Sequence, residues 1–126
     1  LTPQVDSDVC LPLDRVDGFL AAALARVRRL DPGADDFCVA HLGDGNVHYT
    51  VRPSRADPVL MEQVREAVED VVAGMGGSFS AEHGIGLAKL GTMRRRKDAV
   101  AIDVMRAVKR ALDPAGILNP GKVIPD

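Results

Sequence analysis

The stretch HLGDGNVH, residues 41–48, decides the fold that we predict for this chain. Residues 37–42 and 46–51 are interpreted as two strands, and Asp44-Gly45 lies between them. Asp-Gly is among the strongest short signals for a tight hairpin, because the turn needs residues that accept positive φ. The stretch therefore predicts an antiparallel strand pair that Asp44 and Gly45 close.

This turn would place two of the three histidines of the chain on one face of the sheet. His41 would pair directly with His48, and Asn46 would lie on the same face, because side chains alternate along a strand. The same register pairs Leu42 with Val47 and Gly43 with Asn46. Opposed Cβ atoms lie about 4.5–5.5 Å apart, so two imidazoles could hold one metal ion. The alternative is that one histidine packs and the other faces solvent.

A second polar segment, SAEHGIG at residues 80–86, raises the odds of a metal site. Glu82 would complete a set of two histidines and one carboxylate, which suits zinc or another divalent first-row ion with an open position for substrate. His83 would then be a spare base beside the ion. Taken alone, Glu82 has the alternative of a solvated surface carboxylate, and His83 that of a capping or packing histidine.

Helical spacing of apolar residues accounts for most of the remaining chain. The predicted helices span residues 15–30, 58–75 and 87–112, the last with a break near Lys97-Asp98. Asp14 is the predicted N-cap of the first helix, and a short edge strand precedes Pro12. The predicted inner face of the last helix consists of Ala101, Val104, Met105, Val108 and Leu112. One clear hairpin among helices predicts an α+β fold, an antiparallel sheet with helices packed on one face.

Composition excludes several classes of protein. The chain has 126 residues, 46% hydrophobic and 27% charged, with a net charge of −2, which is ordinary for one globular domain over residues 1–126. No apolar run approaches the ~20 residues that span a bilayer. The basic run Arg94–Lys97 lacks an aromatic platform and is interpreted as a solvated helix face. Cys10 and Cys38 lack metal-like spacing, which favours two buried reduced thiols in a cytoplasmic protein.

Three motifs in order resemble the C-terminal domain of the FAD-linked oxidases. They are HLGDGNVH at residues 41–48, SFSAEHGIGLAK at 78–89 and ALDPAGILNPGKVI at 111–124. This is the family of D-lactate dehydrogenase, glycolate oxidase flavoprotein subunit and D-2-hydroxyglutarate dehydrogenase, and the resemblance covers residues 8–122. It implies a larger enzyme, in which an N-terminal domain outside this chain binds most of the FAD. This chain would be the C-terminal segment of the cap domain.

The resemblance also implies roles for individual residues. The metal ligands would be His41, His48 and Glu82, the metal a divalent ion, usually zinc, and His83 the base on the substrate hydroxyl. Contacts to substrate or flavin would come from Asn46 and Asn119. The implied reaction is oxidation of a D-2-hydroxy acid of the lactate, glycolate or 2-hydroxyglutarate class to the 2-oxo acid.

The implied partners are the small hydroxy acid and the FAD domain of the same protein, so that the isolated chain would be inactive. An exposed edge at residues 1–12 predicts a homodimer by strand pairing. Two alternatives remain from the residues: a standalone metal-binding or metallohydrolase module, and a structural domain without oxidase activity. Steady hydrolytic turnover by the isolated chain would favour the first of these, and retained oxidase activity after loss of the ligands would favour the second.

Overall fold

The computed structural model describes residues 2–41 and 43–125, in two compact units, Leu1–His83 and Gly84–Asp126. The first unit contains, in order, β1 (Val5–Cys10), the 3-10 helix η1 (Leu13–Arg15), α1 (Val16–Leu30), β2 (Asp35–His41), β3 (Asn46–Arg52) and α2 (Pro58–Gly74). The second unit contains α3 (Leu90–Arg96) and α4 (Ala99–Leu112). This is the predicted α+β fold.

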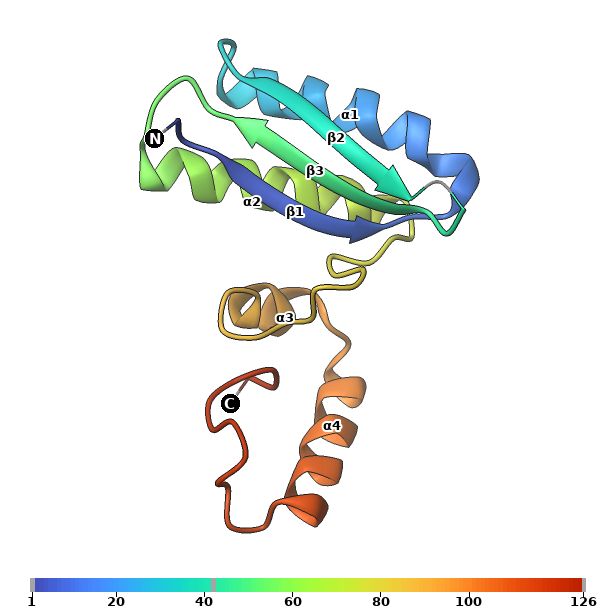
Figure 1. Cartoon of the computed structure of the whole chain (residues 1–126), viewed down its shortest axis with the longest axis vertical. Coiled ribbons are helices and arrows are strands. Elements are labelled where there is room, and N and C mark those ends of the chain that lie inside the picture. The colour runs from blue at the N-terminus through green and yellow to red at the C-terminus, as the bar shows by residue number, and fades with distance from the viewer. Residues whose placement is uncertain (1, 42, 126) are drawn as a thin grey trace. The chain divides into compact units, whose positions relative to one another are not determined.

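The sheet of the first unit has the order β1-β3-β2, and both strand pairs are antiparallel. Helices α1 and α2 lie side by side on one face of this sheet, and the other face carries no helix among the described residues of this unit (Figure 1). After α2 the chain returns to the outer edge of β1, where Ser78 forms a bridge with Cys10. The succession βαββα with a short fourth edge is the split βαβ, ferredoxin-like arrangement.

The central strand β3 shows why the sheet has two different faces. Its alternate residues Val47, Tyr49 and Val51 are at most 1% exposed and face the helices. The ring of Phe19, on α1, meets the ring of Tyr49 edge to face, with 5.4 Å between centroids. Burial, together with the hydrogen bond that the phenol donates to the Asp36 carboxylate, raises the pKa of Tyr49 well above its ordinary value. The intervening residues of β3 therefore belong to the opposite, open face.

The predicted hairpin register is wrong by two residues. His41 pairs with Asn46, and Val39, not His41, pairs with His48. The turn is longer than two residues: the N–H of Asp44 donates to the carbonyl of His41 at 3.2 Å, and the Asp44 carboxylate accepts from the N–H of Asn46. The predicted pair of Leu42 with Val47 involves a residue outside the described ranges, and Val47 pairs with Ala40. Because the side-chain period of a strand is two, both histidines still lie on one face.

The predicted helices over residues 15–30 and 58–75 are α1 and α2, each within one residue of its predicted bounds, whereas the predicted cap of α1 is wrong. The second predicted helix is α2, and the Asp57 carboxylate caps it by accepting from the N–H of Val59 at 2.9 Å. Asp14 does not cap α1, whose N-cap residue Arg15 makes no side-chain cap bond. The physical reason is η1, because this short helical turn contains Asp14 and makes Arg15 the residue that precedes α1.

The predicted break in the last helix is confirmed, and its predicted inner face is wrong. Lys97 and Asp98 separate α3 from α4, and Asp98 caps α4. The exposed fractions of Val104, Val108 and Leu112 are 57%, 53% and 77%, and Ile102 is the buried residue of α4. The C-terminal tail contacts the polar side of α4, where Arg106 donates to the carbonyl of Pro125 at 3.0 and 3.2 Å. The apolar stripe is therefore left open within this unit.

Two further sequence expectations concern the cysteines and the membrane. Cys10 and Cys38 are both free, Cys10 is half-buried and Cys38 is exposed, so the expectation of two buried thiols is wrong for both. Cys38 is exposed because it lies on the edge strand β2. Within residues 2–41 and 43–125, no helix has both the length and the apolar character that crossing a bilayer requires.

A buried carboxylate at the end of α1 gives the unit a dependence on pH. Asp31 is 3% exposed and accepts from the backbone N–H and the hydroxyl of Ser54, at 2.7 and 2.8 Å, and from the N–H of Gly33 at 3.3 Å. These hydrogen bonds lower the pKa of Asp31 below its ordinary 3.8, and the bond from the backbone N–H of Ser54 has the largest effect. A lowered folded-state pKa gives stability that is complete above the unfolded value and lost as the pH falls through the folded one.

We expect Asp31→Ala to lower the free energy of unfolding by about 2–3 kcal/mol at neutral pH, because buried donors lose a charged acceptor. We also expect a flatter dependence of this free energy on pH below about 4. Urea unfolding at pH 7 and at pH 3 measures both effects. Asp17→Ala, in the exposed first turn of α1, is the control. Equal losses of stability in the two variants would contradict the assignment.

Candidate metal centre

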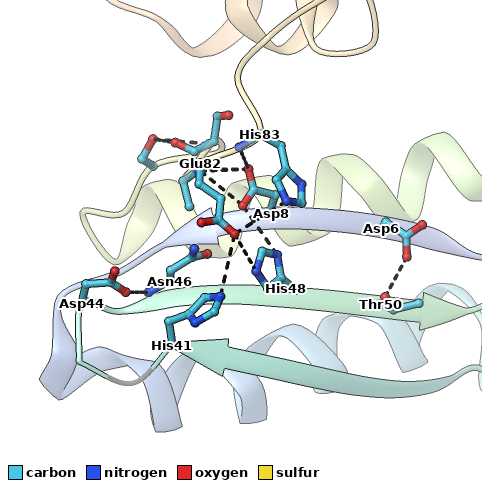
Figure 2. A network of polar contacts seen from close by, with 12 residues as sticks. Asp6, Asp8, His41, Asp44, Asn46, His48, Thr50, Glu82 and His83 are labelled. Atoms are coloured by element: carbon cyan, nitrogen blue, oxygen red, sulfur yellow. Dashed lines mark hydrogen bonds and ion pairs between the residues drawn. The ribbon is translucent and has the colours of Figure 1, made fainter.

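A cluster of histidines and carboxylates lies on the open face of the sheet (Figure 2). Strand β1 supplies Asp8, β2 supplies His41 and β3 supplies His48. The segment after α2, which returns along β1, supplies Glu82 and His83. Residues from four separate parts of the first unit thus meet at one place.

One oxygen of Glu82 is the centre of this cluster. Its Oε1 lies 3.1 Å from Nε2 of His48, 3.6 Å from Nε2 of His83 and 3.8 Å from Nε2 of His41. The dashed lines from Glu82 to His41 and His48 in Figure 2 mark two of these approaches. Three imidazole nitrogens therefore point toward one carboxylate oxygen.

The three imidazole rings are close to one another. The rings of His41 and His48 meet edge to face with centroids 5.4 Å apart, and those of His48 and His83 stack with centroids 5.1 Å apart. The arrangement suits ring nitrogens that share a cation with the Glu82 carboxylate.

Asp8 holds the loop of Glu82 and His83 in place. Its side chain is 7% exposed, and its carboxylate accepts from the backbone N–H groups of Ala81, Glu82 and His83 at 3.0–3.4 Å. One of its oxygens also lies 3.7 Å from Nδ1 of His48, within ion-pair distance and too long for a hydrogen bond. A carboxylate behind a histidine ligand is a common way to orient the ring toward a metal. We assign Asp8 the role of holding the loop of Glu82 and His83, since backbone N–H groups of this loop donate to its carboxylate.

The turn between the two histidines is fixed by contact with β1. Gly45 has φ +74°, and a Cβ there would lie 2.0 Å from the carbonyl oxygen of Leu11. The N–H of Leu11 donates to the carbonyl of Gly45 at 3.0 Å. Only glycine fits this position, so the GDGN sequence ties the hairpin end to β1 and fixes where His41 and His48 lie.

Asn46 has a buried oxygen without a hydrogen bond. The residue is 5% exposed, pairs with His41 on β2 and with Cys10 on β1, and its Oδ1 has no partner among the described residues. Buried acceptors are nearly always satisfied, so this oxygen is a candidate for a hydrogen bond that the described residues do not supply.

The residues present fit a divalent metal. Imidazole nitrogens with one carboxylate are the usual donors for zinc and its first-row neighbours. Bonds of about 2.1 Å in a tetrahedral site put donor atoms roughly 3.4 Å apart, close to the 3.1, 3.6 and 3.8 Å measured around Glu82 Oε1. Ligand atoms of Asp8, His48, Glu82 and His83 all lie within 4.8 Å of one another.

The structure brings together five of the six residues that the sequence singled out for the site. His41, His48, Asn46, Glu82 and His83 share the open face of the sheet. Asn119 lies in the second unit, with φ 46°. Asp8 was missed by the sequence analysis. The sequence of β1, VDSDVC, gives no local signal that separates Asp8 from Asp6, and only the burial of Asp8 in the structure distinguishes the two.

Fold and cluster define the class: an α+β domain whose open sheet face carries an imidazole and carboxylate site of the kind that binds divalent metals. Residues 3–123 match the family described as FAD linked oxidases, C-terminal domain. The chain belongs to this family, as its motifs predicted.

Curated relatives cover nearly the whole chain. D-2-hydroxyglutarate dehydrogenase, mitochondrial, of Bos taurus is 40% identical over 119 residues, which are 94% of this chain and 21% of that protein. D-2-hydroxyglutarate dehydrogenase of Xanthomonas citri pv. viticola is 38% identical over 122 residues, 93% of this chain and 26% of that protein. D-lactate dehydrogenase (cytochrome), mitochondrial, of Arabidopsis thaliana is 34% identical over 127 residues, which cover 94% of this chain and 21% of that protein. The chain spans about a fifth to a quarter of their length.

Proposed function

We propose that this chain is the substrate-facing part of an FAD-dependent enzyme that oxidises a D-2-hydroxy acid to the 2-oxo acid. The observation that carries the proposal is the convergence of His41, His48 and His83 on Oε1 of Glu82. Family membership supports the FAD, and relatives named as D-2-hydroxyglutarate and D-lactate dehydrogenases support the substrate class.

The proposed roles follow from position and chemistry. His41, His48 and Glu82 would hold a divalent metal, which we propose to be zinc. Such an ion would supply a Lewis acid that lowers the pKa of a substrate hydroxyl, and a flavin bound by the FAD domain would supply the hydride acceptor. Asp8 fixes the loop of Glu82 and His83 by its three backbone hydrogen bonds.

His83 is the proposed general base. Its side chain is 64% exposed, and its Nε2 lies 3.6 Å from Oε1 of Glu82, beside the proposed metal site. We propose that Nε2 takes the proton of the substrate's C2 hydroxyl, so that His83 holds this proton in the product state. A bound flavin would supply the acceptor for the C2 hydrogen and its electron pair, which leaves the 2-oxo acid. The orphaned Oδ1 of Asn46 would accept a hydrogen bond from substrate or from the flavin.

Other predicted properties remain proposals. Asn119 is a proposed contact to substrate or flavin. A homodimer through the edge at residues 1–12 is proposed with one restriction, since Ser78 pairs with Cys10 and occupies part of that edge. A cytoplasmic location is also only a prediction, and the names of the Bos taurus and Arabidopsis thaliana relatives read mitochondrial.

The test uses the full-length protein that carries this chain and its FAD domain. Elemental analysis measures bound metal, and anaerobic addition of D-2-hydroxy acids measures bleaching of the oxidised flavin. We expect bound zinc and rapid bleaching by at least one D-acid, with the L-acids inactive. A flavin that every D-2-hydroxy acid leaves oxidised would contradict the proposal. Hydrolytic turnover by the isolated chain would favour the metallohydrolase alternative.

A further inference from the structure

The two oxygens of the Asp8 carboxylate face two different parts of the cluster (Figure 2). Oδ2 accepts from the backbone N–H groups of Ala81, Glu82 and His83, at 3.2, 3.3 and 3.0 Å. Oδ1 lies 3.4 Å from the N–H of Glu82 and 3.7 Å from Nδ1 of His48. One oxygen therefore faces the loop alone, and the other also faces the ring of His48.

The bonds to Oδ2 fold the loop without the help of a bound ion. The three N–H groups belong to consecutive residues, 81–83, in a segment outside the helices and strands. Successive N–H groups that converge on one anion form a nest, which favours negative charge. The anion here is a side chain of β1 that is 7% exposed, so water competes little for these charge-assisted bonds. The loop is thereby held against β1, with Glu82 beside the histidines.

The two ring nitrogens of His48 lie in different surroundings. Nε2 is 3.1 Å from Oε1 of Glu82, and Nδ1 is on the side of Asp8. A neutral imidazole carries one proton, so a ring that offers the lone pair of Nε2 to a metal has its proton on Nδ1. A carboxylate on the Nδ1 side favours this tautomer.

From this geometry we propose that Asp8 is a positioning residue that forms the metal site before the ion binds. Oδ2 places the loop of Glu82 and His83, and Oδ1 favours the tautomer of His48 that leaves Nε2 free for the metal. The inference rests on the proposed function, because it takes the cluster as a metal site. It adds to that function a residue outside the proposed ligands.

The two tasks together require a carboxylate. An asparagine has one acceptor oxygen and one NH₂ donor, so its NH₂ must face either the backbone N–H groups of the loop or Nδ1 of His48. In the first case a donor meets donors, and the loop loses its acceptor. In the second case the NH₂ donates to Nδ1, and the ring proton is held on Nε2, where it blocks the metal. Asp8→Asn is therefore expected to impair the site although it keeps the size of the side chain.

The first test measures the zinc affinity of Asp8→Asn in the full-length flavoprotein, by competition with a chromophoric chelator. We expect binding to weaken by about 10- to 100-fold, the usual cost of removing a hydrogen-bond partner of a metal ligand. Asp6→Asn is the matched control, since Asp6 is an exposed residue of the same strand whose carboxylate accepts from the hydroxyl of Thr50. The control should keep the wild-type affinity. A folded Asp8→Asn variant with wild-type affinity would overturn the inference.

The second test uses the wild-type protein and does not depend on the folding of a variant. Hydrogen exchange of the amides of residues 81–83 is followed by mass spectrometry in the full-length flavoprotein, with zinc bound and after its removal by a chelator. If Asp8 forms the site in advance, these amides stay protected without the metal. Exchange as fast as in an unstructured peptide after zinc removal would show that the ion orders the loop, and would overturn the inference.

Failure of the proposed function has a different signature. A zinc-bound protein whose flavin every D-2-hydroxy acid leaves oxidised would defeat the proposed oxidation and leave the role of Asp8 in place. A wild-type protein with no affinity for zinc would overturn the metal site, and the inference with it.

Discussion

Replacement of Glu82 by glutamine is expected to have the largest effect of any single substitution in this chain. Its Oε1 is the atom that the three imidazole nitrogens share, at 3.1–3.8 Å, so no other side chain replaces it. The glutamine keeps the size and removes the charge that balances a divalent ion. We expect metal binding to weaken by more than about 100-fold, and flavin reduction by substrate to slow by about 10³-fold, the loss of several kcal/mol of Lewis-acid stabilisation.

The measurement is metal content after dialysis against a weak chelator, combined with stopped-flow reduction of the flavin. Glu62→Gln is the matched control, because it removes the same charge from α2, on the helix-covered side of the sheet. The control should retain metal and rate. Full activity in Glu82→Gln would show that the carboxylate is not a ligand, and would support the structural alternative for this domain.

His83→Gln is expected to give the second largest effect, and to separate a base from a ligand. If His83 removes the hydroxyl proton, the variant keeps its metal and reduces flavin about 10²- to 10⁴-fold more slowly. The slow rate should rise at high pH, where hydroxide or a water replaces the base. Metal analysis and the pH dependence of flavin reduction are the two measurements.

His41→Gln provides the contrast, because His41 and His83 lie at similar distances from Glu82, 3.8 and 3.6 Å, and both side chains are more than half exposed. We expect His41→Gln to lose metal and His83→Gln to retain it. The reverse result would exchange the two roles. Such an exchange is chemically plausible, since His83 belongs to the compact group of ligand atoms around Asp8 and His48.

Much of the fold was predictable, because local patterns determine most of it. The apolar period of α2 and the proline and aspartate at its start gave its limits within one residue. The alternation along β3 correctly assigned Tyr49 to the core and His48 to the opposite face, although the pairing was two residues out of register. The error arose from turn length, since Asp44-Gly45 was read as the whole loop, and the side chain of Asp44 caps a longer one.

The remaining misses have a common cause, which is contact between distant parts of the chain. The carboxylate of Asp8 accepts from the N–H of Ala81 across 73 residues, and no local period reports such a contact. The apolar stripe of α4 was identified by its spacing, but spacing does not say what covers a face. In the second unit its residues Val104 and Val108 are more than half exposed. The positions of His41 and Glu82 are likewise compatible with metal binding, which the metal content of the His41→Gln and Glu82→Gln variants tests.

The hairpin also constrains which changes of chain length this domain tolerates. Because faces alternate with every residue, adding or deleting two residues in the turn keeps His41 and His48 on the same side of the sheet. A single inserted residue in β2 would instead rotate His41 into the helix-covered side and remove it from Glu82. Single-residue insertions should therefore be tolerated in the turn, where the pairing of His41 with Asn46 is kept, and not within β2 or β3. This rule is set by the pleat of the sheet, independently of which metal or substrate the site binds.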